Sequence, residues 1–175
     1  MAKKQKNYDD VMTPFVFPAG TTGFSHLMKP DEFPEGVFKY KVQVNIGDTP
    51  EWEETIKKLQ QFQDDRSVAN GKAPKPLTCI QTKNGVKYLE FHSYNKQPVV
   101  DKNNQPYDEE PWRGSIVRVF SQPEYYSGFG GGITLYMNKV QVVENTKNSG
   151  GGPSREDPFA VPTPPEAGED PFNGI

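Results

Sequence analysis

Hydrophobic and polar residues alternate along several short segments of the chain. The clearest is "VFKYKVQVNI" (residues 37–46), in which aromatic and aliphatic side chains take every second position and Lys39, Lys41 and Gln43 lie between them. A period of two predicts a half-buried strand, with Phe38, Tyr40, Val42, Val44 and Ile46 on the core face. Further strands are predicted for 77–82 and 86–93, which flank the turn "KNG", and for 115–120 and 132–143.

One segment has helical spacing instead. Thr49 suits an N-cap, Pro50 suits the first helical position, and Asn70–Gly71 ends the run. Helical spacing of three or four residues connects Trp52, Ile56, Leu59 and Phe62 or Gln63. Short strands with a single inserted helix predict a mainly β fold: a five-stranded Greek-key barrel, of which the OB-fold is the commonest kind.

The end of the chain differs in composition. Residues 145–154 ("NTKNSGGGPS") form a Gly-rich linker, and five prolines follow without hydrophobic periodicity. Such a segment buries too little surface to offset its chain entropy. We therefore predict a flexible N-terminus (1–13), an OB-fold domain (14–145) and a flexible, disordered acidic tail (146–175).

Charge divides the chain in the same way. Residues 1–150 carry 19 Lys and Arg against 18 Asp and Glu, a net charge of +1, whereas residues 151–175 carry one Arg against five acids, a net charge of −4. There is no apolar stretch long enough to span a membrane and no secretory leader pattern, and the single Cys79 excludes an internal disulfide. We expect a cytoplasmic protein.

Candidate catalytic chemistry is sparse. His26 and His92 are far apart and lack ligand spacing, and the "GFGGG" of residues 128–132 lacks the Lys-Ser/Thr of a phosphate-binding loop and reads as a hairpin tip. The carboxylates Asp108, Glu109 and Glu110 could bind a metal, although solvated loop charge explains them better. The sequence predicts no catalytic set, no metal site and no cofactor.

Aromatic and basic residues outside the predicted core are more informative. Aromatic rings stack unpaired bases, and cations follow the phosphates, in proteins that bind single-stranded nucleic acid. Phe91 and Phe120 fit a core position equally well, whereas aromatics at the loop tip have little structural reason to be there. The candidate DNA-binding residues are Lys39, Lys41, Lys87, Phe91, Tyr94, Arg113, Arg118, Phe120, Tyr125, Tyr126, Phe129 and Tyr136.

Two long stretches carry a family resemblance. "GTTGFSHLMKPDEFPEGVFKYKVQVNI" (20–46) and "GSIVRVFSQPEYYSGFGGGITLYMNKVQVVE" (114–144), followed by an acidic tail, resemble phage-encoded single-stranded DNA-binding proteins of the T-odd coliphage type. Residues 64–110 match only in outline. The resemblance implies an OB-fold with a helix inserted after the first strands. It also implies sequence-independent binding of single-stranded DNA during phage replication, recombination and repair in an infected bacterial cell.

The resemblance also assigns roles to residues. Tyr126, and with less support Tyr125, match the loop aromatics that stack bases in the family, and Arg118 falls on its basic strand. Family members are often dimers, so a homodimer is allowed. Their tails contact replication proteins such as the DNA polymerase and compete with DNA for the binding groove.

The word "EDPF" occurs twice in the tail. It resembles the acidic-Pro-Phe tip of bacterial single-stranded DNA-binding proteins, and on a tether it would act as a peptide ligand present in two copies. The tail departs from the phage family in having few acids and in ending with "FNGI" after the last aromatic. A solubilising tail with a chance repeat is the alternative. The candidate partner-binding residues are Glu156, Asp157, Phe159, Glu169, Asp170 and Phe172.

Two other functions remain open from the sequence. One is a protein-interaction adaptor whose barrel binds no nucleic acid; tight binding to an oligonucleotide would contradict it. The other is a metal-dependent nuclease that uses Asp108, Glu109 and Glu110, which predicts cleavage of DNA in the presence of magnesium.

Overall fold

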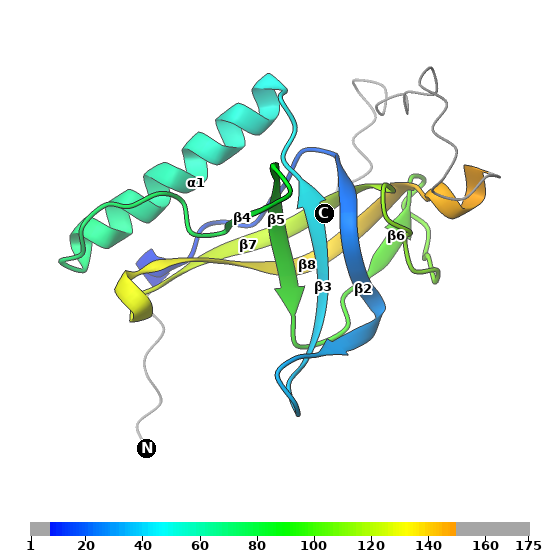
Figure 1. The fold of residues 1–175 in the computed structure, drawn as a ribbon, viewed down its shortest axis with the longest axis horizontal. Coiled ribbons are helices and arrows are strands. Elements are labelled where there is room, and N and C mark those ends of the chain that lie inside the picture. The colour runs from blue at the N-terminus through cyan, green and yellow to red at the C-terminus, as the bar shows by residue number, and fades with distance from the viewer. Residues whose placement is uncertain (1–7, 150–175) are drawn as a thin grey trace.

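A computed structural model describes residues 8–149 of the chain (Figure 1). No helix in this range is long and apolar enough to cross a membrane. The elements are, in order, η1 (Tyr8–Asp10), β1 (Phe15–Val16), β2 (Gly20–Glu32), β3 (Phe38–Asn45), α1 (Pro50–Ala69), β4 (Ile80–Lys83), β5 (Val86–Ser93), β6 (Val99–Asp101), β7 (Ile116–Tyr126), η2 (Gly128–Gly130), β8 (Gly132–Glu144) and η3 (Thr146–Ser149).

Five of the strands close into a barrel. β2 pairs with β3, β3 with β5, β5 with β8 in parallel, β8 with β7, and β7 returns to β2, so the ring has no free edge among these strands. This pairing confirms the predicted mainly β fold with a five-stranded barrel and one inserted helix. β7 and β8 continue beyond the barrel as a long two-stranded arm.

The barrel interior is filled by aliphatic and aromatic side chains from every strand of the ring. The alternation seen in the sequence is retained: Val42 and Val44 of β3 are buried, and so are Ile133, Leu135 and Met137 of β8. The buried core consists of Phe17, Leu27, Val42, Val44, Trp52, Leu59, Leu77, Leu89, Phe91, Val99, Val117, Val119, Ile133, Leu135, Met137, Val140 and Val142.

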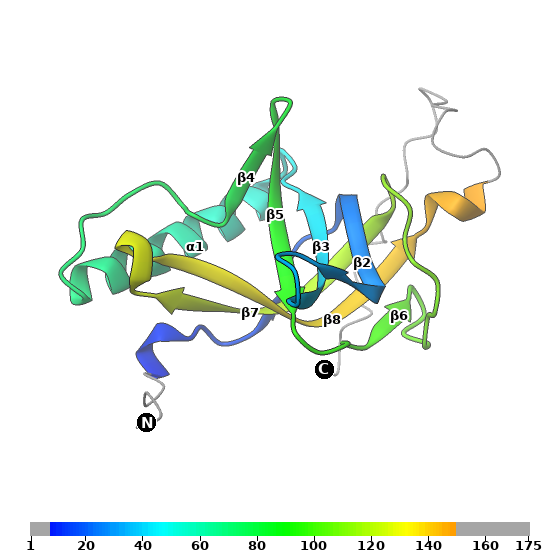
Figure 2. The same ribbon diagram turned by 60° about the horizontal axis from the view of Figure 1, so that its bottom comes forward.

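Helix α1 begins and ends where its sequence signals predict. The Thr49 hydroxyl accepts a hydrogen bond from the Trp52 N–H (3.3 Å), Pro50 occupies the first turn, and Asn70 caps the C-terminus. The helix lies along the arm formed by β7 and β8 (Figures 1 and 2). Its indole at Trp52 is buried and donates to the Ala19 carbonyl (3.0 Å), which ties the helix to the start of β2.

The "KNG" turn forms the predicted β-hairpin between β4 and β5, which projects from the barrel in Figure 2. Asn84 and Gly85 connect the strands with φ of 52° and 77°. Two central residues with positive φ are the requirement of the turn that matches the right-handed twist of paired strands. The "GFGGG" segment likewise lies at a hairpin tip, between β7 and β8.

One expectation about the body of the chain is wrong. Phe38 is 52% exposed, although the alternation placed it on the core face. It pairs with Glu32 at the outer end of the β2–β3 hairpin, beyond the part of the strand that the barrel covers. Residues before the predicted start of the domain at residue 14 also contact the barrel and helix: the Met12 N–H donates to the Pro123 carbonyl (3.0 Å), and Arg66 pairs with Asp10 (2.8 Å).

Most of the predicted tail (146–175) is outside the range that the structure describes. Thr146–Ser149 form η3, whereas residues 150–175, and residues 1–7 at the other end, lie outside the described range. The candidate partner-binding residues all fall there and stay predictions: Glu156, Asp157, Phe159, Glu169, Asp170 and Phe172.

Candidate nucleic-acid interface

One row of side chains crosses four strands on the outside of the barrel. His26 of β2 is the register partner of Lys41 of β3, Lys41 is the partner of His92 of β5, and His92 is the partner of Tyr136 of β8. Residues directly opposite one another in a sheet project from the same face. We call this row, together with Phe24, Lys39 and Tyr94 beside it, the aromatic face.

The rings and cations of the aromatic face touch one another. The ring centroids of His92 and Tyr136 are 5.1 Å apart, and those of His92 and Tyr94 are 6.0 Å apart, both edge to face. The Phe24 and His26 centroids are 5.8 Å apart. These spacings are those of interacting aromatic pairs, so the rings form two groups, Phe24 with His26 and His92 with Tyr94 and Tyr136, and Lys41 lies between the groups in the register.

Each lysine of the aromatic face lies over a ring. Nζ of Lys41 is 5.1 Å from the centroid of Phe24, and Nζ of Lys39 is 5.5 Å from that of Tyr94. A cation within about 6 Å of a ring centroid is attracted to its negative face. The two positive charges are therefore held beside the rings, where the phosphates of a strand with stacked bases would pass.

His92 is the central ring of the row and carries no charge at neutral pH. Burial, and to a smaller extent the nearby ammonium groups of Lys39 and Lys41, lower its pKa to about 4. A neutral imidazole keeps its donor and acceptor and offers a flat surface to a base. The site thus combines the two lysine cations with a neutral imidazole at the centre of the row.

The depressed pKa of His92 predicts a pH dependence of stability. The unfolded chain binds a proton at His92 near pH 6.5 and the folded chain only near pH 4, so the free energy of unfolding should fall as pH is lowered from about 6.5 to 4. In His92→Phe this loss should be smaller by about 1 kcal/mol between pH 6.5 and 5, after allowance for the partly exposed ring. Urea unfolding of both chains at the two pH values measures it; parallel curves would contradict the assignment.

A second group of candidate residues lies at the tip of the β7–β8 arm. Phe129 is fully exposed there and Tyr126 is 37% exposed. The Lys75 ammonium donates to the Phe129 carbonyl (3.3 Å), which brings a cation from the segment after α1 to the tip. The Tyr126 ring lies against Gly132, where a Cβ would be 2.3 Å from the tyrosine oxygen. The glycine therefore allows this ring to pack across the arm.

Two predicted base-stacking residues are buried, and their assignment is corrected. Phe91 has no exposed surface and meets Phe17 edge to face at 4.9 Å inside the barrel. Tyr125 is 6% exposed, and its hydroxyl donates to Oγ of Ser67 on α1 (3.4 Å). Both lie on the inward side of their strands, and the helix covers the part of the arm where Tyr125 is located.

The remaining predicted residues are distributed around the barrel. Lys87 is on the same side of β5 as Leu89 and Phe91, the side opposite the aromatic face. Arg113 is exposed in the loop before β7. Arg118 and Phe120 are half-buried on β7 and alternate with the buried Val119. The structure brings Lys39, Lys41, Tyr94 and Tyr136 together, and it leaves Lys87 and Arg113 outside this group.

Sequence reasoning missed three members of the aromatic face. Phe24 and His26 belong to β2, whose register with β3 shifts twice, so no regular alternation marks them. In the sequence, His92 is a candidate only for a metal ligand, and its spacing does not support that role. Its position between Phe91 and Ser93, both buried, is the signal that places it on the outward side of β5.

The acidic run before β7 has a structural role. The Glu110 carboxylate accepts hydrogen bonds from the N–H groups of Leu27 (2.7 Å) and Met28 (3.1 Å) and from the Ser25 hydroxyl (3.1 Å). Between residues 8 and 149 no three His, Cys, Asp or Glu side chains group as metal ligands would. The geometry around Glu110 thus gives no support to a nuclease centre.

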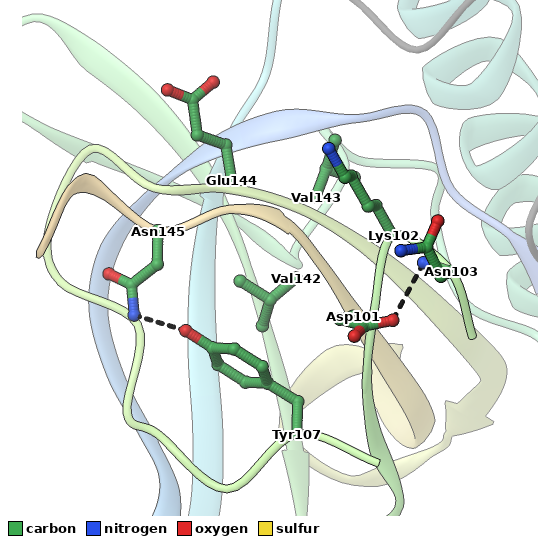
Figure 3. A pocket seen from close by; sticks show the side chains of 8 residues that line it. All are labelled: Asp101, Lys102, Asn103, Tyr107, Val142, Val143, Glu144 and Asn145. Atoms are coloured by element: carbon green, nitrogen blue, oxygen red, sulfur yellow. Dashed lines mark hydrogen bonds between the residues drawn. The ribbon is translucent and has the colours of Figure 1, made fainter. Parts of the chain in front are cut away.

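A hollow of about 290 Å³ lies at the other end of β8, beside β6 (Figure 3). Its polar groups bond to one another: Nδ2 of Asn145 donates to the Tyr107 hydroxyl (2.8 Å), and the Asn103 N–H donates to the Asp101 carboxylate (2.8 Å). These bonds fix the turn after β6 against the barrel. The hollow takes no residue from the aromatic face, so we treat it as part of the scaffold.

Comparison with known proteins gives structural matches only. No family model matches the chain, and no curated protein matches it with significance. Among solved structures, it is similar to gp2.5, a single-stranded DNA-binding protein encoded by bacteriophage T7. The TM-score is 0.63 at 18% identity, over 83% of this chain and 94% of that one.

The single-stranded DNA-binding protein of bacteriophage Enc34 matches as well. Its C-terminal truncation gives a TM-score of 0.59 at 15% identity, over 83% of this chain and 97% of the other. Its complex with single-stranded DNA gives 0.58 at 18% identity, over 82% and 94%. At these identities the matches establish a shared fold, and they confirm the fold implied by the resemblance seen in the sequence.

Proposed function

We propose that this chain binds single-stranded DNA without sequence preference, through the aromatic face. The observation that carries the proposal is the row His26–Lys41–His92–Tyr136, which places rings and a cation side by side across four strands. Support also comes from the fold, which is shared with a phage protein solved in complex with single-stranded DNA. In OB-folds the corresponding barrel surface and the adjoining hairpin loops bind oligonucleotides.

The chemistry of the face favours unpaired bases over duplex. A stacked base contributes about 1–3 kcal/mol, and every base has a flat surface, so stacking gives affinity without sequence readout. In a duplex the bases are already stacked on one another and cannot lie on Tyr94 or Tyr136. The binding step requires no catalysis and no metal, since it consists of stacking and ion pairing alone.

The small number of cations predicts a weak dependence on salt. Each lysine that neutralises a phosphate of a single strand contributes a slope of about −0.7 to the plot of log affinity against log salt concentration. If Lys39 and Lys41 supply the principal contacts, the slope should be about −1 to −2. Most of the affinity should therefore survive at salt concentrations that release a protein bound mainly through charge.

Titration of the full chain with oligo(dT) and with a duplex of equal length, across a salt series, tests the proposal. We expect quenching of aromatic fluorescence by oligo(dT) with the shallow slope, and much weaker binding of the duplex. Equal affinity for both, or a steep slope with duplex preferred, would contradict binding by stacking. No response to either DNA would favour the protein-interaction adaptor instead.

The wider role is a further part of this proposal. Binding of this kind would serve DNA replication, recombination and repair in the cytoplasm of a phage-infected bacterium. The repeated "EDPF" words would recruit replication or recombination proteins, because two tethered copies raise the local concentration of a peptide ligand. A chain ending at Gly152 should keep its DNA affinity or bind more tightly, and should lose the partner; retention of the partner would assign recruitment to the barrel.

A further inference from the structure

The charge of Lys41 is already neutralised by a partner. Its ammonium lies 2.5 Å from the Asp31 carboxylate, with 17% of the lysine side chain and 31% of the aspartate side chain exposed. The hydrogen bond from Lys41 is the largest cause that lowers the pKa of Asp31, and the charges of Lys41 and His26 act in the same direction. The cation at the centre of the aromatic face is therefore paired in the free protein.

A bulge in β2 puts Asp31 in this position. His26 is the register partner of Lys41, and Asp31 is the partner of Lys39, so residues 27–30 of β2 lie opposite Tyr40 alone. The extra residues bend the strand, and the Asp31 carboxylate reaches Lys41 rather than its register partner. The pairing is thus set by the backbone.

The bulge itself is anchored from outside the hairpin. The Glu110 carboxylate accepts from the N–H groups of Leu27 and Met28, the first two residues of the bulge. The backbone is therefore held at Met28, three residues before Asp31. This fixed geometry distinguishes the contact from the many surface ion pairs between two mobile side chains.

We propose that Asp31 competes with DNA phosphate for Lys41. Its carboxylate occupies the position at the Lys41 ammonium that a phosphate of a bound strand would take. The inference rests on the proposed function, since it concerns the same aromatic face. A phosphate that reaches Lys41 has to displace the carboxylate, and the carboxylate returns to Lys41 when the phosphate leaves. Asp31 thereby lowers the affinity for single strands and speeds their release.

Asp31→Asn removes the competing charge and keeps the size of the side chain. We expect oligo(dT) to bind about two- to fivefold more tightly, in line with the modest strength of partly exposed ion pairs. Most of the gain should be a slower dissociation rate. The matched control is Glu35→Gln, which removes one negative charge at the exposed tip of the same hairpin. Its effect should be clearly smaller, and equal gains in the two variants would overturn the proposal.

A double-mutant cycle separates the local contact from general charge. In a Lys41→Met background the cation that pairs with Asp31 is gone. Asp31→Asn should then raise the affinity for oligo(dT) by no more than Glu35→Gln does. The same gain with and without Lys41 would overturn the proposal. Thermal unfolding of each variant checks that the barrel is intact.

The wild-type chain offers a test that needs no variant. The pKa of the Asp31 carboxyl, followed by NMR, should rise when oligo(dT) saturates the protein, because Lys41 leaves it for a phosphate. Thymine does not titrate in this acidic range, so the bases of oligo(dT) add no titration of their own to the measurement. An unchanged pKa in the complex would overturn the competition. If the wild-type chain binds no oligo(dT), the proposed function fails as well; if it binds and Asp31→Asn equals its control, only this inference fails.

Discussion

Tyr136→Ala should weaken binding of oligo(dT) by about 10- to 100-fold. The ring of Tyr136 ends the row on β8 and packs on His92 with centroids 5.1 Å apart. Its loss removes one stacking platform, worth about 1–3 kcal/mol, and leaves the neighbouring imidazole without its edge contact. Fluorescence titration at fixed salt measures the affinity, and the salt slope should stay as in the wild-type chain, because no cation has been removed.

Tyr136→Phe is the matched control. It retains the ring and loses only the hydroxyl, so its affinity should remain within about threefold of the wild-type value if stacking is the main contribution. Both variants should unfold at similar temperatures, since Tyr136 lies on the outer side of β8 while Leu135 and Met137 fill the core. An alanine variant that binds as tightly as the phenylalanine variant would remove Tyr136 from the interface.

The fold could be predicted where the local pattern is regular. The period of two indicates the buried Val42 and Val44 of β3 and Ile133, Leu135 and Met137 of β8, whereas a register shift after Met137 changes the phase and buries Val140, Gln141 and Val142. The helix was marked by its cap, its first-turn proline and its spacing. β2 was harder, because two register shifts interrupt its alternation and place Phe24, His26 and Asp31 by bulge geometry. A one-dimensional period contains no information about such shifts.

The candidate site depends on register between strands that are distant in the sequence. Lys39, Lys41, Tyr94 and Tyr136 could be selected as outward-facing residues one strand at a time. That they lie beside His26 and His92 follows only from the pairing of β2, β3, β5 and β8. The same limitation explains the errors at Phe91 and Tyr125: alternation separates two faces of a strand, and the barrel and α1 decide which of them is buried.

Glu110→Ala should destabilise the barrel by about 2–4 kcal/mol. The substitution strips the acceptor from the partly buried N–H groups of Leu27 and Met28, whereas the Ser25 hydroxyl retains the Pro111 carbonyl as an acceptor (2.9 Å). Hydrogen bonds to a charged group contribute about 1.5–3 kcal/mol each, and water can replace part of the loss at these partly buried groups. Urea unfolding followed by tryptophan fluorescence measures the difference.

Glu109→Ala is the control for Glu110, one residue away in the same acidic run. Its carboxylate lies 4.0 Å from the Lys147 ammonium, and both side chains are nearly half exposed, so its removal should change stability by no more than about 0.5 kcal/mol. Equal effects of the two substitutions would mean that Glu110 does not anchor the bulge. A selective effect of Glu110→Ala should also reach the aromatic face. The bulge between His26 and Asp31 sets the Asp31–Lys41 pair, and loosening it should raise the pKa of Asp31 toward its ordinary value in the free protein.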